Sequence, residues 1–469
     1  MKIILIIPDG VVVRNYLYSD FVNELTQRGF EIYVFHQIPN AAVAEIKTVS
    51  QDIKEFIFIP YFTEPFIARI IREVVVYARL LINKKKLKNE TILYFWSRNQ
   101  KGFKRKLLLN LSEFLGFFVS KSYNAILFLE KKYDNLMLKT NVAQELSKEI
   151  DRIQPDIVLN LHQRSMTSAP IINYSKSKGI KSATVIYSWD NVPKARLVSS
   201  YDYYFVWSEL MKNELDLLYP EIDSNKVMVV GTPQFEFYFN KKLHLTKSEF
   251  FEKYKLDVNK KTICFSSNDT SSPYDPTYLE DLCEEISKIE VAVRPQILFR
   301  INPFDKSGRF NCILEKYKNL VSVVNPDWRT ETEGDGNFIN IFPSYNDISL
   351  LVNTVLHSDV VVNLGSTMAH DFAVLDKPCL YFNYDPEVNS KLPVKEVYQF
   401  QHFRSMNNLE AVGWINTKLE IATKILKAIE EPSQIGKDRS KWMELIVKHP
   451  LNENSKNLAN ELEKTCTSV

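Results

Sequence analysis

Short apolar runs alternate with longer amphipathic segments along most of the chain. In the first half these runs are four to seven residues long and nearly continuous in hydrophobicity, which is typical of strands buried on both faces of a parallel sheet. Residues 18–28 carry Phe21, Val22 and Leu25 at helical spacing and end before Gly29, a frequent helix stop. The first series of predicted strands comprises residues 2–8, 31–35, 55–60, 156–161, 182–187, 203–207 and 227–230.

A second series follows a charged passage without strand-like runs, residues 241–261. Its predicted strands are residues 262–266, 296–301, 320–324, 340–342, 359–363 and 379–382. Residues 410–463 then show a helical pattern whose apolar positions include Trp414, Ile421 and Trp442. The whole pattern predicts an α/β protein with two facing Rossmann-like domains, parallel sheets and a C-terminal helical segment.

The joint between the two series sets the domain boundaries that we expect. The N-terminal domain covers residues 1–240 and contains a basic amphipathic insertion at about 65–130. The C-terminal domain covers residues 241–430. The helices of residues 431–469 pack back across the joint. Ligands of doubly wound sheets bind at the carboxyl ends of the strands, so the site is expected in the cleft between the domains.

Composition excludes several protein classes. The 469 residues are 45% hydrophobic and 25% charged, and the net charge of +2 gives no reason to expect a polyanionic partner. Five scattered cysteines form no CxxC pair, which favours a reducing cytoplasm. No uncharged apolar run reaches eighteen residues, so no membrane span is expected.

The chemistry-bearing segment is VVVNLGSTMAHDFAVLDKP, residues 360–378. It predicts a strand that ends at Gly365-Ser366-Thr367 and a helix that begins there. Unpaired backbone N–H groups at a helix start attract phosphate, and the two hydroxyls add donors. Asp371 follows on the same face, where a carboxylate reaches ribose hydroxyls. The alternative is that Ser366 or Thr367 only caps the helix.

This order of motifs resembles the donor site of GT-B glycosyltransferases. Lys377-Pro378 and a further strand follow it, and three other motifs occur in the corresponding order: Pro8-Asp9-Gly10, Val230-Gly231-Thr232-Pro233 and Ser344-Tyr345-Asn346-Asp347-Ile348. The chain is particularly similar to bacterial surface-polysaccharide transferases, to teichoic-acid glycerophosphotransferases and to UDP-N-acetylglucosamine 2-epimerases.

The resemblance implies roles for the donor-site residues. Gly365, Ser366 and Thr367 would hold the donor diphosphate, Asp371 the ribose, and the loop containing Pro343 and Ser344 the base. Relatives often have Glu at the position of Asp371, which is one methylene shorter. No cofactor is implied, because the nucleotide sugar is a co-substrate.

Arg300 ends a predicted strand just before Asn302-Pro303, where relatives often show Arg-x-His-Pro. Its guanidinium can bind phosphate through two hydrogen bonds. The alternative pairs Arg300 with a surface acid. Ser267 and Asn268 end the first strand of the second series and are expected to line the cleft, unless they form a plain turn.

Sugar transfer needs a base for the acceptor hydroxyl and positive charge for the departing diphosphate. Asp9, His162 and Asp190 each follow a predicted strand of the first domain and are the candidate bases. A structural histidine and a helix cap are the alternatives for His162 and Asp190. Acids are not paired in a DxD motif at a strand end, so the expected reaction needs no metal. Neighbouring candidates for acceptor binding are Gly10, Arg14, Arg164 and Asn191.

A basic block separates the first strands from the rest of the first domain. From Arg69 to Lys106 the chain has twelve Lys or Arg residues and two acids, and an apolar segment with Phe114, Phe117 and Phe118 follows. Such a surface, residues 69–129, binds anionic lipid headgroups. Its alternative is a solvated helical face. Nucleic acid is not expected as a partner, since no nucleic-acid module accompanies the block.

The leading hypothesis is a glycosyltransferase of bacterial surface-polysaccharide (capsule or lipopolysaccharide) assembly. It would act in the cytoplasm, in peripheral contact with the inner face of the membrane, on a nucleotide-sugar donor and a glycan or lipid-linked acceptor. The alternatives are a nucleotide-sugar 2-epimerase on the same fold and a non-catalytic nucleotide- or glycan-binding subunit. The sugar, the base and the stereochemistry are not defined by the sequence.

Overall fold

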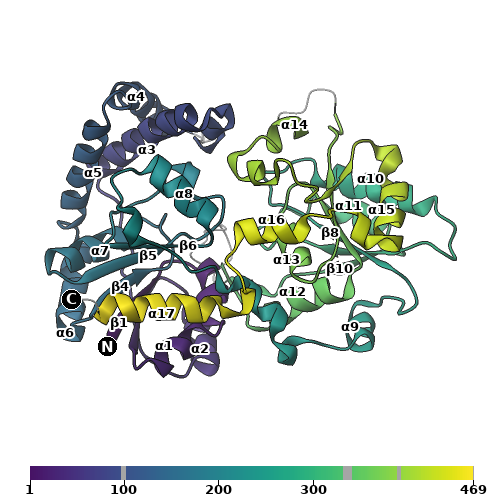
Figure 1. The fold of residues 1–469 in the computed structure, drawn as a ribbon, viewed down its shortest axis with the longest axis horizontal. Coiled ribbons are helices and arrows are strands. Elements are labelled where there is room, and N and C mark those ends of the chain that lie inside the picture. The colour runs from purple at the N-terminus through teal and green to yellow at the C-terminus, as the bar shows by residue number, and fades with distance from the viewer. Residues whose placement is uncertain (97–101, 331–340, 388–391, 468–469) are drawn as a thin grey trace.

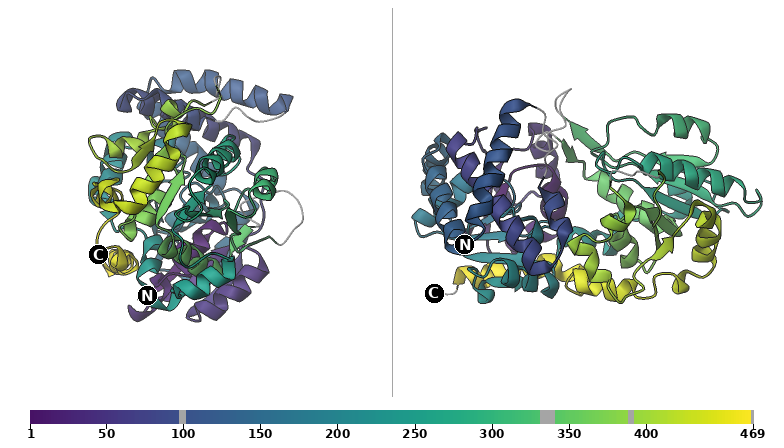
Figure 2. Two further views of the ribbon diagram at one scale, coloured as in Figure 1. Left: turned by 90° about the vertical axis from the view of Figure 1, so that its right-hand side faces the viewer. Right: turned by 90° about the horizontal axis from the view of Figure 1, so that it is seen from above.

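The computed structural model describes residues 1–96, 102–330, 341–387 and 392–467, which form two lobes side by side (Figures 1 and 2). The first lobe is built on a seven-stranded sheet in the order β3-β2-β1-β4-β5-β6-β7, with all neighbours parallel. Its strands are β1 Lys2–Ile7, β2 Glu31–His36, β3 Ile53–Phe58, β4 Ile157–Asn160, β5 Lys181–Val185, β6 Tyr203–Val206 and β7 Val227–Val229.

Helices cover both faces of this sheet, which is why the central strands read as continuous apolar runs. In β1 every residue from Ile3 to Ile7 is fully buried. The covering elements are the π-helix η1 Val13–Leu17 and helices α1 Phe21–Gln27, α2 Asn40–Val49, α6 Asn141–Ile153, α7 Ser168–Ser177 and α8 Glu209–Leu218.

A helical insertion lies between β3 and β4 in the chain, and its helices α3 and α4 run across the top of the first lobe in Figure 1. It comprises α3 Phe66–Leu87, the 3-10 helix η2 Glu90–Phe95, α4 Phe103–Val119 and α5 Tyr123–Met137. Gly116 of α4 lies where a Cβ would come 2.9 Å from the Val74 carbonyl oxygen of α3, so α4 packs closely on α3.

The second lobe is built on a six-stranded parallel sheet in the order β10-β9-β8-β13-β14-β15. Its strands are β8 Thr262–Ser266, β9 Gln296–Arg300, β10 Val321–Val324, β13 Val360–Asn363, β14 Cys379–Phe382 and β15 Gly413–Ile415. Its helices are α9 Lys247–Tyr254, α10 Asp275–Ser287, α11 Asn311–Lys316, α12 Asn346–His357, α13 Met368–Val374, α14 Val394–Val397 and α15 Ile421–Glu430. The predicted α/β architecture with two parallel sheets is confirmed.

Two predicted elements differ in the structure. The helical pattern of residues 410–463 begins with a strand, β15, because Trp414 packs edge-on against Tyr381 and Tyr398 with ring centroids 5.9 and 4.8 Å apart. The strand predicted at 340–342 is β12 Ile341–Pro343. It pairs antiparallel with β11 Trp328–Thr330 outside the main sheet, and Asn340 lies outside the described residues.

The chain returns to the first lobe at its end. Helix α16 Arg439–Ile446 contacts α8 and α13, and α17 Asn454–Thr467 packs on α1 beneath the first sheet (Figure 1). Arg28 donates hydrogen bonds of 2.9 and 2.6 Å to Asn460 of α17. Gly231, at φ +85°, leaves room for the Asn454 side chain, which would overlap any Cβ at that position. These contacts fix the C-terminal segment to the first lobe and to the joint between the lobes.

Candidate functional site

Both sheets change strand order at one point, and the candidate residues follow the strands at these points. β1 and β4 are neighbours in the first sheet, and β8 and β13 are neighbours in the second. The chain leaves each pair in opposite directions, which opens a crevice at the carboxyl ends of the strands. Asp9 and His162 follow the first pair, and Ser267 and Gly365 follow the second.

Two adjoining cavities occupy these crevices. The smaller, of about 290 Å³, is lined by Arg14, Ser267, Arg300, Ser366, Thr367 and Asp371, among others. The larger, of about 1260 Å³, is lined by Asp9, His162, Arg164, Asp190, Asn191 and Thr367, among others. Tyr187, Ser188 and Thr367 line both cavities, so the predicted donor and acceptor residues meet there.

The Gly365 turn has the geometry that its sequence predicts. Gly365 has φ +62°, and a Cβ there would lie 2.8 Å from the Phe403 ring, so glycine is required. The Ser366 N–H donates to Asn363 Oδ1 at 2.9 Å. Thr367 makes no capping hydrogen bond with its side chain, and the Ser366 hydroxyl accepts from the Met368 N–H at a long 3.4 Å. Helix α13 is only seven residues long, so its dipole is weak. A phosphate at this turn would therefore be attracted mainly by nearby cations.

Arg300 supplies one such cation. Its Nη2 lies 3.4 Å from each carboxylate oxygen of Asp347, which is fully buried rather than a surface acid. Its Nη1 is buried and has no hydrogen-bond partner within the described residues. Asp347 also accepts from the Asp327 N–H and the Trp328 indole, both at 2.9 Å. Its negative charge is thus shared among several donors, and Arg300 retains capacity for an anion in the smaller cavity.

Asp371 lines the same cavity and is hydrogen-bonded to a residue of the segment that links the two lobes. The Tyr238 hydroxyl donates to Asp371 Oδ1 at 2.8 Å. Burial raises the pKa of Asp371, whereas the hydrogen bond from Tyr238 and the charges of Arg14 and Arg300 lower it. Tyr238 belongs to the 3-10 helix η5 Pro233–Phe239, which links the lobes, so Asp371 is hydrogen-bonded to the joint.

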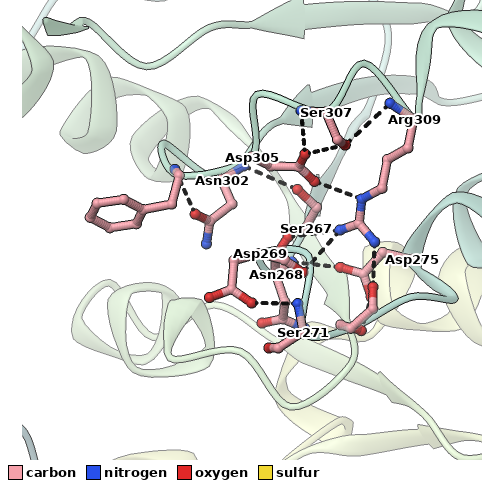
Figure 3. Close-up of polar contacts among 11 residues, drawn as sticks. Ser267, Asn268, Asp269, Ser271, Asp275, Asn302, Asp305, Ser307 and Arg309 are labelled. Atoms are coloured by element: carbon pink, nitrogen blue, oxygen red, sulfur yellow. Dashed lines mark hydrogen bonds and ion pairs between the residues drawn. The ribbon is translucent and has the colours of Figure 1, made fainter. Parts of the chain in front are cut away.

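A hydrogen-bonded network fixes the loops after β8 and β9 (Figure 3). The Ser267 hydroxyl accepts from the Asn302 N–H at 3.0 Å, and Asn302 Oδ1 accepts from the Phe304 N–H at 3.0 Å. Asn268 donates to the Leu364 carbonyl at 2.9 Å and is not among the residues lining the two cavities. Asn302, where relatives often show His, thus shapes the loop and also lines the smaller cavity. Arg309 closes the network through Asp305 and the carbonyls of Asn268 and Asp269.

Three further predicted residues lie at the contact between the lobes and are not among the residues that line the cavities. A Cβ at Gly10 would come 2.0 Å from the Ile341 carbonyl oxygen, so Gly10 permits β12 to approach. The Pro343 carbonyl accepts from Tyr18 at 3.4 Å, and the Ser344 hydroxyl donates to Asp327 at 2.5 Å. None of the three lines either cavity.

Asp9 and His162 form a dyad. His162 Nδ1 lies 2.7 Å from Asp9 Oδ2, and Asp9 Oδ1 accepts from the Val11 N–H at 3.1 Å. Because a carboxylate only accepts, Nδ1 donates to Asp9, and in the tautomer protonated at Nδ1 alone Nε2 is an acceptor. Nε2 has no hydrogen bond within the described part of the chain, and His162 lines the larger cavity. This arrangement can remove a proton from a hydroxyl.

Asp190, in contrast to His162, is engaged by a cation and a hydroxyl and is a poor candidate for the base. It accepts from Lys194 at 2.5 Å and from the Ser188 hydroxyl at 2.7 Å. Burial raises the pKa of Asp190, but the charges of Lys194 and His402 and these hydrogen bonds outweigh it and hold the pKa far below its ordinary value. A carboxylate with so low a pKa is a poor base, so the geometry favours His162 among the three candidates.

Comparison with known proteins identifies the fold. No protein-family model and no curated protein matches the sequence. Solved structures do match over nearly the whole chain: a UDP-GlcNAc 2-epimerase from Neisseria meningitidis bound to UDP-GlcNAc (12% identity, 99% of this chain and 100% of that one, TM-score 0.52), the S. aureus MnaA–UDP structure (12%, 100% and 97%, 0.55), and a glycosyltransferase from Rickettsia africae (13%, 99% and 98%, 0.53). The chain has the GT-B fold.

Several cavity residues of this GT-B chain escape prediction from sequence. Tyr187 and Ser188 follow β5, and their position after a strand is the signal that could have found them. His370 lines the smaller cavity with both ring nitrogens buried and without partners among the described residues. Burial lowers the pKa of His370 to about 3, so the ring is neutral. Arg196 lines the larger cavity, and no local motif distinguishes it.

Two kinds of feature are absent from the described residues of this GT-B structure. Among the described residues, no cluster of three or more His, Cys, Asp or Glu side chains is placed to hold a metal ion. In the same part of the chain, no helix is both long enough and apolar enough to cross a bilayer.

Proposed function

We propose that this protein is a metal-independent glycosyltransferase that moves a sugar from a nucleotide-sugar donor to a glycan or lipid-linked acceptor in bacterial surface-polysaccharide biosynthesis. The observation that carries the proposal is the Asp9–His162 dyad, which lines a large cavity that adjoins a small cationic one. A base beside one cavity and positive charge beside the other are the two requirements of sugar transfer.

The smaller cavity is the proposed donor site. Structures of the same fold are described as bound to UDP-GlcNAc and UDP, which supports a nucleotide diphosphate as ligand here. Arg300 and Arg14 would neutralise the diphosphate and stabilise it as it leaves, in place of a metal ion. Thr367 lies at the junction of the cavities, where the transferred sugar would sit.

The larger cavity is the proposed acceptor site. An acceptor hydroxyl within reach of His162 would lose its proton to Nε2 as its oxygen attacks the anomeric carbon of the donor. The bond between that carbon and the diphosphate oxygen breaks, and the diphosphate leaves with the electron pair. Asp9 fixes the ring orientation and stabilises the imidazolium that forms.

Epimerisation of a nucleotide sugar is the second candidate, because structures of this fold include UDP-GlcNAc 2-epimerases. An epimerase acts on the donor alone and needs no acceptor site. The cavity of about 1260 Å³ exceeds what a donor sugar needs and so favours transfer.

Product analysis separates the candidates. Purified protein is incubated with UDP-GlcNAc and other nucleotide sugars, with and without a bacterial lipid-and-glycan extract, and the products are followed by NMR. Transfer predicts release of the nucleoside diphosphate that depends on the extract. An epimer formed from donor alone identifies the second candidate, and no turnover of any donor supports a binding subunit and contradicts both.

We also propose that the protein makes peripheral contact with anionic lipid on the inner face of the cell membrane. Helix α4 presents an apolar row to solvent, with Phe103 81%, Phe114 62% and Phe118 53% exposed. Glu113, the one acid of α4, accepts from the Trp96 indole at 2.8 Å. Exposed basic residues flank the row: Lys104, Arg105, Lys106 and Lys121. Apolar insertion with cationic ends suits anionic lipid.

The basic block contributes less surface charge than its sequence indicates. Arg72 pairs with Glu64 and Glu73, and Arg79 pairs with Glu130 and Glu221, all at 2.6 to 2.8 Å. Both arginines line the larger cavity instead of facing a membrane. Arg98 and Lys101 lie outside the described residues. The proposed lipid contact is therefore narrower than residues 69–129 and centres on α4.

A further inference from the structure

The larger cavity contains two guanidinium groups that form no ion pair with a carboxylate among the described residues. Arg164 donates one long hydrogen bond, 3.4 Å, to the Asn191 amide oxygen. Arg196 makes no hydrogen bond or ion pair with any residue that the structure describes. Both arginines line the cavity, on the segments that follow β4 and β5.

The other buried charges of this cavity are already satisfied. Its remaining buried cations and its carboxylates bond to one another or to polar neighbours: Arg72 to Glu64 and Glu73, Arg79 to Glu130 and Glu221, Lys194 to Asp190, Asp9 to His162, and Asp134 to Asn173. Asp269, which also lines the cavity, accepts only from the Ser271 N–H and forms no ion pair with either arginine. Arg164 and Arg196 are therefore two cations of this cavity without an ion-pair partner among the described residues.

The electrostatics of the pair are unfavourable without an anion. Burial lowers the pKa of both guanidiniums, although the charge of Asp190 raises the pKa of Arg164. In Arg196, the charge of Glu73 raises the pKa, whereas the charges of Arg72 and Arg164 lower it further. A bound anion would relieve this repulsion and accept the free N–H donors.

Apolar side chains form another part of the same wall. Helices α3 and α5 contribute Ile71, Val75, Val76 and Leu127, and the segment after Arg196 contributes Leu197 and Val198. A ligand made only of a sugar and a phosphate is polar and would gain little from contact with these apolar side chains. We propose that Arg164 and Arg196 bind the phosphate of an acceptor whose apolar chain lies along this wall, with the acceptor hydroxyl directed toward His162. The inference rests on the proposed transfer function, because it names the acceptor class of that site.

Calorimetric titration with three probes tests the proposal: farnesyl phosphate, farnesol and inorganic phosphate, each below its aggregation limit. The full chain is compared with Arg164→Gln, Arg196→Gln and the charge-keeping Arg164→Lys. Arg152→Gln is the matched control, because Arg152 is half exposed and paired with Glu55 and Glu149. We expect farnesyl phosphate to bind best, each Gln variant to weaken it about tenfold or more, and Arg164→Lys to recover part of the loss.

The other outcomes are each decisive. Equal binding of farnesyl phosphate by wild type and both Gln variants overturns the anion site. Inorganic phosphate that binds as tightly as farnesyl phosphate overturns the apolar chain and leaves a free-phosphate site, and farnesol that does so overturns the role of phosphate. UDP, GDP, CDP and dTDP are titrated in parallel: a protein that binds one of them but not farnesyl phosphate refutes this inference alone, whereas a protein that binds none of them refutes the proposed function. Unchanged thermal unfolding shows that the variants fold.

Discussion

At the residue scale, the contacts of three side chains at the ends of the first sheet's strands favour one of them as the proposed base. Asp9, His162 and Asp190 all follow strands, and their sequence context does not rank them. The contacts do: Asp9 holds His162 Nδ1 at 2.7 Å, while Asp190 is neutralised by Lys194. The ranking depends on which side chains meet across the sheet, at a separation of 153 residues for the dyad, and this cannot be read from local sequence.

Asp9→Asn tests the dyad. The amide no longer fixes the tautomer that leaves Nε2 as an acceptor, so the transfer rate should fall about 10²- to 10⁴-fold while nucleotide affinity is kept. Steady-state kinetics and UDP titration measure the two effects. Asp269→Asn is the control, since Asp269 lines the same cavity and only accepts from the Ser271 N–H. Full activity of Asp9→Asn would exclude the proposed base.

At the residue scale, the sequence locates the ends of strands. It places Gly365 after one strand and Arg300 at the end of another, and in the structure Gly365 lies in the turn after β13 and Arg300 ends β9, while their roles in binding stay predictions. Gly10 also follows a predicted strand but packs against β12. Arg196 was missed because its environment is assembled from distant segments, among them α3.

At the scale of elements, apolar periodicity gave the two strand series, but it does not separate a buried face from an exposed one. Helix α4 buries Leu108, Leu109, Ser112 and Gly116 and exposes a second apolar row. Only the packing on α3 shows which row is left to solvent. Strand β15 has only three residues, which is too few for the alternation typical of a strand to be recognised in the sequence.

The exposed row of α4 predicts the behaviour of Phe114→Ser/Phe118→Ser. Loss of two inserting rings should weaken binding to liposomes that contain anionic lipid by about tenfold or more. Flotation measures the binding, and high salt should weaken that of wild type. Val291→Ser/Val293→Ser is the control, because both valines are exposed on the second lobe. Equal flotation of wild type and the α4 variant contradicts lipid contact, and a dimer lost in that variant assigns the row to a second copy.

At the scale of the whole molecule, the chain crosses between the lobes twice and the second crossing ties the joint. Glu236 of η5 accepts from the Ser455 N–H at 2.5 Å and from its hydroxyl at 2.6 Å. Burial raises the pKa of Glu236 to about 7 although these hydrogen bonds lower it. A carboxyl whose pKa is raised on folding stabilises the fold below its unfolded pKa and loses that stabilisation as pH rises through the folded value.

The variant Glu236→Gln tests the contribution of the Glu236–Ser455 contact to stability. The stability of wild type should fall between about pH 4.5 and pH 7 through this group, and the amide, which cannot ionise, should remove that part of the slope. At pH 8 we expect the variant to be more stable by roughly 1–3 kcal/mol. Denaturant unfolding at pH 5 and pH 8 measures the difference. An unchanged slope would show that Glu236 is not protonated in the folded state.

The central claim is that the smaller cavity between the lobes binds a nucleoside diphosphate through Arg300 and Arg14. Calorimetric titration of UDP, GDP, CDP and dTDP into wild type, Arg14→Gln and Arg300→Lys tests it most directly. The account predicts one nucleotide site per chain and an affinity about 10- to 100-fold lower in each variant, with Arg329→Gln, an exposed arginine outside the cavity, unchanged. It is contradicted if no nucleotide binds to wild type, or if both cavity variants bind as tightly as wild type.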